Sequence, residues 1–146
     1  MEHLADRIIE RFDGAIALVA RVLMSTLFLL AGMAQIGHVK SFTEGLASDG
    51  IPVVLGGLVF WFLILSGVLL MLGTATRLVA LAQAGFCLLS GLMAYADLAE
   101  PTDMIMLLKN IALTGGFLFV ALHGPGRYSI DHWRQQLAMR EPPAPR

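Results

Sequence analysis

Long apolar segments separated by short polar breaks dominate the pattern of the chain. They cover residues 14–37, 53–72, 78–96 and 104–123. A helix needs about 20 mostly apolar residues to cross the hydrocarbon of a bilayer, and each segment is close to that length. No segment alternates polar with apolar residues, and an open sheet could not satisfy its backbone in lipid. The pattern therefore predicts an all-α bundle of four transmembrane helices.

The breaks contain residues that stop helices. We expect a polar loop over residues 38–52, a tight turn over 73–77 and an acidic, proline-containing loop over 97–103. After His123 the sequence Gly-Pro-Gly cannot continue a helix. These breaks place the four predicted spans between short connections.

Polar flanks enclose the predicted membrane domain, which covers residues 14–123. Apolar residues in the first flank, 1–13, recur at helical spacing, so this flank is either a helix in the membrane interface or a solvated continuation of the first span. It mixes both charge signs, so we expect the first span to stay as an anchor instead of being cleaved. The tail, 124–146, ends in a proline-rich stretch that we expect to be disordered.

Basic residues gather on one side of the predicted membrane. That side holds Arg7, Arg11, Arg21, Arg77, Arg127, Arg134, Arg140 and Arg146. The opposite loops hold Lys40 as their only basic residue, beside several acids. Because cytoplasmic loops carry the excess of basic residues, the pattern predicts that both termini are cytoplasmic and that the chain is a multi-pass protein of a bacterial inner membrane.

Composition narrows the classes of function. The chain is 57% hydrophobic and only 14% charged, whereas soluble domains are about 25% charged. The net charge of −1 offers no basic excess for a nucleic acid. Cys87 is the single cysteine, so no intrachain disulfide forms. No metal-binding or nucleotide-binding motif occurs in the sequence, and we expect no metal and no intrinsic cofactor.

Polar residues near one end of the apolar segments are the first candidates for function, because such residues are costly in lipid. On the side opposite the arginines they are Gln35, His38, Tyr95, Lys109 and Asn110. Together they could form a pocket for a polar headgroup such as a quinone carbonyl. Alternatively they form ordinary interhelical hydrogen bonds, worth about 0.6 kcal/mol each. Lys109 could also reach the interface or pair with Asp97 or Asp103.

Two arginines on the other side are candidates for contact with lipid or a partner protein. Arg21 lies about two turns inside the first apolar segment. From there its side chain can reach the interface, and we expect it mainly to anchor the segment. Arg77 lies in the predicted turn between the second and third segments.

Several short motifs occur in a recognisable order between Arg21 and Asp131. They are Arg21 with Phe28-Leu29-Leu30-Ala31-Gly32, Phe42 with Leu46, Gly50 and Pro52, Gly67 with Leu72-Gly73, Thr76-Arg77-Leu78, Lys109-Asn110, Gly115-Gly116, Gly124-Pro125-Gly126 and Ser129-Ile130-Asp131. In this order they resemble the DoxX family of small bacterial four-span membrane proteins. The chain departs from the family pattern at Gln35, where a lysine is frequent, and at Leu63, where a glutamate is frequent.

The resemblance implies a four-span fold and a broad set of functions. Some relatives are subunits of thiosulfate:quinone oxidoreductase, and others are linked to membrane complexes that handle oxidative or thiol stress. We therefore expect a small membrane subunit of a quinone-linked or oxidative-stress redox complex, with redox partner proteins and no self-contained catalytic site. A non-catalytic scaffold or lipid-binding protein and a small oligomeric transporter stay open as alternatives, as does a homo-oligomer.

Overall fold

The computed structural model describes the backbone at residues 2–48, 52–95 and 97–140, and this part of the chain is helical without any strand. Its helices are α1 (Glu2–Met33), α2 (Val39–Ser48), α3 (Val53–Leu72), α4 (Thr76–Ala94), α5 (Pro101–His123) and α6 (Ile130–Arg140). Four of these, α1, α3, α4 and α5, are long and apolar enough to cross a membrane. The predicted all-α, four-span fold is confirmed.

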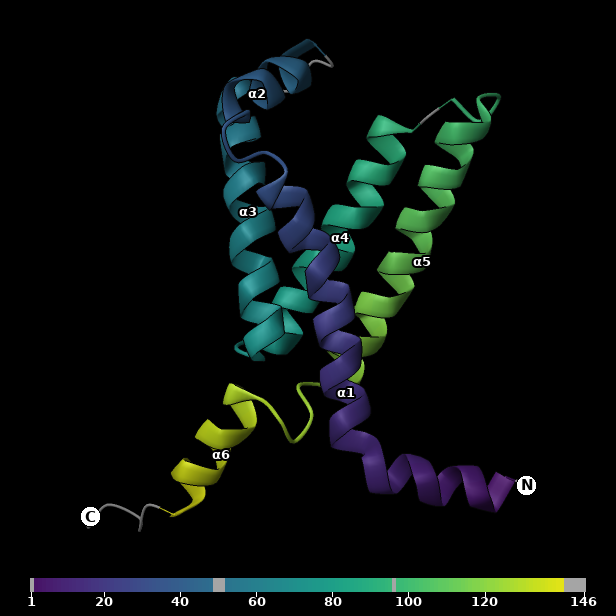
Figure 1. The fold of residues 1–146 in the computed structure, drawn as a ribbon, viewed down its shortest axis with the longest axis vertical. Coiled ribbons are helices and arrows are strands. Elements are labelled where there is room, and N and C mark those ends of the chain that lie inside the picture. The colour runs from purple at the N-terminus through teal and green to yellow at the C-terminus, as the bar shows by residue number, and fades with distance from the viewer. Residues whose placement is uncertain (1, 49–51, 96, 141–146) are drawn as a thin grey trace.

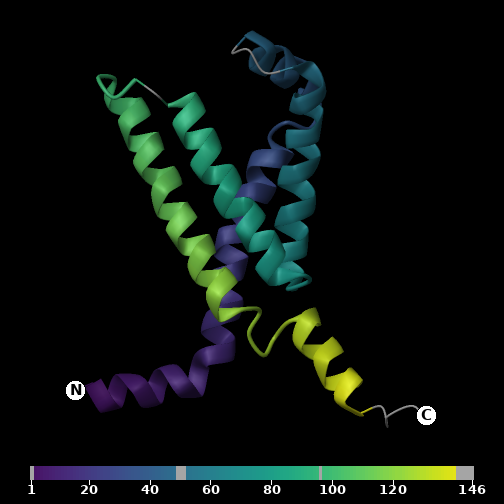
Figure 2. The ribbon, with the colours of Figure 1, turned by 180° about the vertical axis from the view of Figure 1, so that it is seen from behind.

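The four long helices form two pairs that diverge from one end. In one pair α1 packs against α3, and in the other α4 packs against α5. The pairs meet near the end that carries the α3–α4 turn, the first turns of α1 and the helix α6, which we call the terminal end (Figure 1). They spread apart toward the loop end, where α2 and the α4–α5 connection lie (Figure 2). The bundle therefore contains a wedge between the two pairs.

Glycines allow the close approach within each pair. A Cβ added to Gly32 of α1 would lie 2.9 Å from Ile64 Cγ1 of α3. A Cβ on Gly91 of α4 would lie 2.8 Å from Asn110 Cβ of α5. Small residues are needed at such positions because lipid gives helices no hydrophobic reason to associate, so close van der Waals packing must hold them together.

An aromatic cluster joins the two pairs in the middle of the bundle. The ring of Phe28 in α1 is only 3% exposed. Its centroid lies 6.4 Å from that of Phe62, 6.0 Å from that of Phe86 and 5.3 Å from that of Phe117, all edge to face. Such pairs contribute about 0.5–1.5 kcal/mol beyond their buried area. Because the four rings come from four different helices, the cluster fixes the point from which the wedge opens.

The first helix differs from the predicted first segment at both ends. It includes the flank from Glu2 onward and ends at Met33, before the predicted limit at residue 37. Gly37 has a φ of 83°, a left-handed conformation that belongs to a turn. The first turns of α1 run across the terminal end at an angle to the rest of the helix (Figure 1). The flank is therefore a helical extension of the first span that bends away from the bundle.

The prediction of a polar loop over residues 38–52 was wrong for most of that range, because the helix α2 occupies Val39–Ser48. This stretch contains no proline, and Lys40 Nζ lies 3.9 Å from Glu44 Oε1, one helical turn away. Pairs at this spacing stabilise a helix by a few tenths of a kcal/mol. The helix packs against α3, which provides further support that the local sequence does not reveal.

The last two spans begin earlier than predicted. Pro101 occupies the first turn of α5, where its missing N–H costs nothing, so this helix starts ahead of residue 104. Helix α4 starts at Thr76 instead of residue 78 because a carboxylate from α6 caps it, as described below. In the tail the structure shows α6, whereas the expected disorder concerns residues 141–146, outside the described residues.

Candidate functional site

Arg21 lies inside the terminal end of the bundle and not at its lipid-facing surface. Its side chain is 1% exposed. Nη1 donates a hydrogen bond of 3.4 Å to the carbonyl oxygen of Leu70, and Nη2 donates one to the carbonyl oxygen of Tyr128. One guanidinium thus joins α1 to the end of α3 and to the connection between α5 and α6. This placement differs from the lipid or partner contact expected for Arg21.

Gly73 leaves the space that this guanidinium occupies. It ends α3 with a φ of 71°, and its N–H donates to the carbonyl oxygen of Leu70 at 3.1 Å. A Cβ at this position would overlap Arg21 Nη1 and would lie 2.6 Å from Ser129 Cβ. Glycine alone meets both the left-handed backbone and the lack of room.

Asp131, at the start of α6, caps the start of α4. Its Oδ1 accepts a hydrogen bond from the N–H of Ala75 at 2.9 Å. Its Oδ2 accepts two more from Thr76, one from the N–H and one from the hydroxyl, both at 2.9 Å. In return the N–H of Asp131 donates to the carbonyl oxygen of Gly73 at 3.0 Å. The α3–α4 turn and α6 are therefore held together by hydrogen bonds in both directions.

The pKa of the Asp131 carboxyl reflects this environment. Partial burial acts to raise it. The hydrogen bonds from Thr76 and Ala75, together with the nearby charge of Arg134, favour the carboxylate and outweigh burial, so the pKa lies below its ordinary value. The ionised form of Asp131 is the one that the fold uses.

We call Arg21, Gly73, Thr76, Ser129 and Asp131 the terminal clasp. Ser129 completes it, since its Oγ donates to the carbonyl oxygen of Gly126 at 2.8 Å and accepts from the N–H of His132 at 3.1 Å. The clasp unites motifs that are up to 110 residues apart in the sequence. Its residues contact one another, which gives the sequence motifs a structural role at the terminal end.

Arg77 lies beside the clasp but remains exposed. A Cβ on Gly124 would lie 3.2 Å from its Nε, so the guanidinium rests against the end of α5. The sequence predicts contact of Arg77 with lipid or a partner. Its side chain is exposed, and this role stays a proposal.

At the other end of the bundle, a cavity of about 210 Å³ lies in the wedge between the helix pairs. All four spans contribute to it, through Leu27, Phe28, Ala31, Leu63, Phe86, Cys87, Ser90, Ala94, Lys109, Asn110 and Leu113, with Tyr95 just after α4. Apolar and aromatic side chains make most of its wall, and polar groups are few. We call this space the wedge cavity.

Three of the five polar residues predicted to form one layer line the wedge cavity: Tyr95, Lys109 and Asn110. Gln35 and His38 do not. They follow the end of α1 in a series of turns, in which the N–H of Gln35 donates to Gly32 and the N–H of His38 donates to Gln35, both at 3.0 Å. The predicted layer is thus brought together on the α4–α5 side of the wedge only.

The polar groups of the cavity keep hydrogen-bond donors available. Lys109 is exposed, and its Nζ lies 3.2 Å from Met106 Sδ, a weak acceptor. The structure shows no ion pair between Lys109 and Asp97 or Asp103, all of which are among the described residues. Asn110 uses one N–H of its amide on the carbonyl oxygen of Met106 at 3.0 Å. An ammonium and an amide therefore border the cavity with unused donor capacity.

The other cavity residues were not among the predicted site residues, and two of them, Cys87 and Ser90, carry a thiol or a hydroxyl. Cys87 entered the sequence analysis only as the single cysteine, and its side chain, 2% exposed, lines the cavity. Ser90 lies beside it and donates to the Cys87 carbonyl oxygen at 3.3 Å. Both lie with Ala94 on one face of α4, and this spacing of small residues ahead of Tyr95 was the signal that could have identified them.

These features define a class: a four-span membrane bundle with a clasped terminal end and a wedge cavity bordered by polar groups. The DoxX family model matches residues 16–96, and the chain belongs to the DoxX family. The chain is 38% identical to the inner membrane protein YqjF of Escherichia coli (strain K12), a match that covers 78% of this chain and 88% of that protein. The inner membrane protein YphA of the same organism is 27% identical, over 78% of this chain and 86% of that protein.

No solved structure gives a significant match. The relatives and the four apolar helices together identify the chain as a multi-pass protein of the bacterial inner membrane.

Proposed function

We propose that this chain is a small membrane subunit of a quinone-linked redox complex, and that it holds a quinone ring in the wedge cavity. The observation that carries the proposal is the composition of that cavity. Aromatic and aliphatic side chains form its wall, and Tyr95, Lys109 and Asn110 supply polar groups on one side. Binding sites for small apolar ligands have this composition, with a few polar groups that fix orientation.

A quinone matches the hydrogen-bonding character of these polar groups. Its carbonyl oxygens only accept hydrogen bonds. The Lys109 ammonium can only donate hydrogen bonds. The Asn110 amide and the Tyr95 hydroxyl can both donate and accept them. Phe28 and Phe86 present aromatic surface to the same space, against which a flat ring can pack. The cavity therefore suits a flat acceptor with apolar faces.

The size of the cavity limits what it can hold. At about 210 Å³ it is smaller than the roughly 300–1,000 Å³ of sites for drug-sized ligands. A single substituted ring is within this limit, but a complete quinone with its isoprenoid chain is not. We assign the isoprenoid tail of the quinone to the lipid around the bundle.

Leu63 limits the role that we assign to this site. The resemblance to the family implies a frequent glutamate at this position, and here the leucine lines the cavity with 8% of its surface exposed. Because the side chain in that place is apolar, it cannot transfer protons. We therefore assign to the cavity only the binding of the quinone ring. Electrons would come from a partner polypeptide. The arginine-rich terminal end would face the cytoplasm, which places the cavity in the outer half of the membrane.

Replacement of Lys109 tests the proposal. The purified chain in lipid nanodiscs is titrated with decylubiquinone, a quinone with a short alkyl chain, and binding is followed by quenching of tryptophan fluorescence. We expect Lys109→Ala to weaken binding about tenfold, because a hydrogen bond from a charged donor contributes roughly 1.5 kcal/mol or more. Lys40→Ala is the matched control, since Lys40 belongs to α2, the helix at the loop end, and does not line the cavity. This variant should bind as the wild type does.

Two results would contradict this function. One is equal affinity in wild type and Lys109→Ala. The other is displacement of the quinone by decanol at the same concentration, which would show that the alkyl chain alone determines binding. Either result would favour a non-catalytic scaffold, the alternative that the sequence leaves open.

A further inference from the structure

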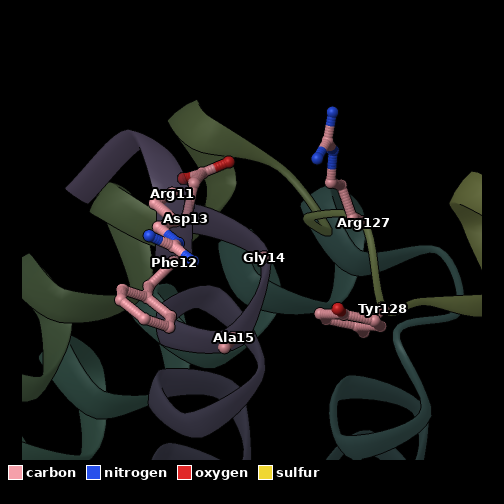
Figure 3. A pocket seen from close by; sticks show the side chains of 7 residues that line it. All are labelled: Arg11, Phe12, Asp13, Gly14, Ala15, Arg127 and Tyr128. Atoms are coloured by element: carbon pink, nitrogen blue, oxygen red, sulfur yellow. The ribbon is translucent and has the colours of Figure 1, made fainter. Parts of the chain in front are cut away.

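A second hollow lies at the terminal end, on the side of the bundle where α1 bends. It measures about 440 Å³. Arg11, Phe12, Asp13, Gly14 and Ala15 of α1 form one side, and Arg127 and Tyr128 of the α5–α6 connection form the other (Figure 3). It contains none of the residues of the wedge cavity, and so its role is independent of the proposed function.

The charged groups around this hollow form no ion pair with one another. Arg11 and Arg127 stand on opposite sides of it, and Asp13 lies near Arg11 (Figure 3). Among the side chains that the structure describes, which in this region begin at Arg11, no carboxylate lies within salt-bridge distance of either guanidinium. The three side chains therefore leave a net charge of +1 around a space that is large enough for a small polar group.

Gly14 brings the two sides of the hollow close together. A Cβ at this position would lie 3.1 Å from both Arg127 Cβ and the Tyr128 ring. The glycine lets the connection after α5 lie directly against α1, so that Arg11 and Arg127, which flank the membrane domain in the sequence, both line this hollow. Arg11 and Arg127 are 116 positions apart in the sequence. Only the folded bundle brings them to the same hollow.

The hollow lies where a phospholipid headgroup would lie. Arg11 is the first residue of the candidate membrane span, which continues to Met33. Immediately along α1, Ile16 is 50% exposed and Val19 is 56% exposed. On the other side, Tyr128 is 63% exposed, and aromatic residues of this kind are enriched at the level of the headgroups. Apolar surface for acyl chains therefore continues directly from the charged hollow.

We propose that this hollow binds the headgroup of an anionic glycerophospholipid of the phosphatidylglycerol type. The phosphate lies between Arg11 and Arg127, whose exposed side chains turn toward it when the lipid binds, because guanidinium groups match its oxygens well. The carboxylate of Asp13 accepts hydrogen bonds from the hydroxyls of the glycerol headgroup. The charge of the lipid, −1, balances that of the site. The acyl chains follow the exposed apolar face of α1.

Native mass spectrometry of the full chain in detergent tests this site. The delipidated protein is titrated with phosphatidylglycerol, with phosphatidylcholine of the same acyl chains and with soluble glycerol phosphate. We expect phosphatidylglycerol to bind most tightly. Arg127→Gln and the double variant R11Q/R127Q should weaken its binding, the double variant by on the order of tenfold. Arg134→Gln removes an exposed arginine of α6 that is outside the hollow, and it should leave the affinity within about twofold.

Three results would overturn the assignment. Equal affinity of the double variant and the wild type would remove the two arginines from any lipid site. An equal loss in Arg134→Gln would show a general effect of charge at this end of the molecule. Competition by glycerol phosphate at the concentrations at which the lipid binds would show that the site takes a soluble phosphate ester. Thermal unfolding of each variant, followed by circular dichroism, shows that the compared proteins are folded.

Discussion

Gly73→Ala is expected to lower the free energy of unfolding by about 4–7 kcal/mol, the sum of a backbone cost and the cost of displacing a buried charge. The left-handed backbone at this residue costs any other side chain roughly 1–2 kcal/mol. The added Cβ would also overlap Arg21 Nη1, so the guanidinium would have to leave the carbonyl oxygens that hold it. Displacing a buried charge from its partners costs about 3–5 kcal/mol in soluble proteins. Unfolding by sodium dodecyl sulfate in mixed micelles, followed by circular dichroism, measures the change.

Gly57→Ala is the control, because Gly57 lies inside α3, the helix that Gly73 ends, and a Cβ there meets no atom within 4 Å. It should leave stability unchanged or raise it slightly, since alanine favours helix more than glycine does. If the two substitutions had the same effect, the clasp would not depend on the space at Gly73.

Asp131→Asn should lower the free energy of unfolding by about 2–3 kcal/mol. The carboxylate accepts hydrogen bonds from Ala75 and Thr76, and hydrogen bonds to a charged group contribute about 1.5–3 kcal/mol. The amide keeps one acceptor oxygen, but its NH₂ group would face donors of the α3–α4 turn. Glu100→Gln, which removes an exposed carboxylate that makes no side-chain cap, should change stability little.

The same variant identifies the pH dependence of the clasp. Because the pKa of Asp131 is lower in the folded chain, its contribution is complete above the ordinary value of about 3.9. The contribution declines as the pH falls through the lowered pKa. The difference in stability between wild type and Asp131→Asn should therefore shrink between pH 5 and pH 2. Fluorescence of Trp133 in a Trp61→Phe background reports the release of α6. A constant difference across this range would exclude Asp131 as the titrating group.

The four spans could be predicted because hydropathy depends on composition alone. Residues 53–72 form α3 with the bounds that the pattern gives. The helix α2 could not be predicted in the same way, since its sequence is short and polar and its support comes from α3. A helix surrounded by lipid can therefore be predicted from local composition. A helix that depends on packing against one neighbour is harder to predict in this way.

The terminal clasp illustrates why burial of a charged residue is hard to predict. Arg21 stands in an apolar segment two turns from an interface, where a side chain that reaches outward and one that turns inward have the same sequence pattern. What decides is the presence of carbonyl oxygens from Leu70 and Tyr128, which are 49 and 107 residues away. Only the packed bundle places these acceptors beside Arg21.

The wedge cavity could be predicted in part from depth in the membrane. Lys109 and Asn110 are consecutive in α5, and Tyr95 directly follows the end of α4, the helix that packs against α5. These three residues share a depth and lie on neighbouring helices, so they line the same space. Gln35 and His38 share the depth but follow the end of α1, where turns replace the helix. The depth of a residue follows from its position along the chain. To predict the direction of its side chain, one must also know how the helix is rotated about its axis and where it ends.

The central claim is that the two helix pairs form a wedge whose cavity holds a quinone ring. Photoaffinity labelling with an azido-quinone in nanodiscs, followed by mass spectrometry of the peptides, tests it most directly. We predict that label enters the segments around Cys87–Tyr95 and Lys109–Leu113, and that unlabelled decylubiquinone removes it. Label spread over the lipid-facing sides of all four spans, and unchanged by the competitor, would contradict the claim.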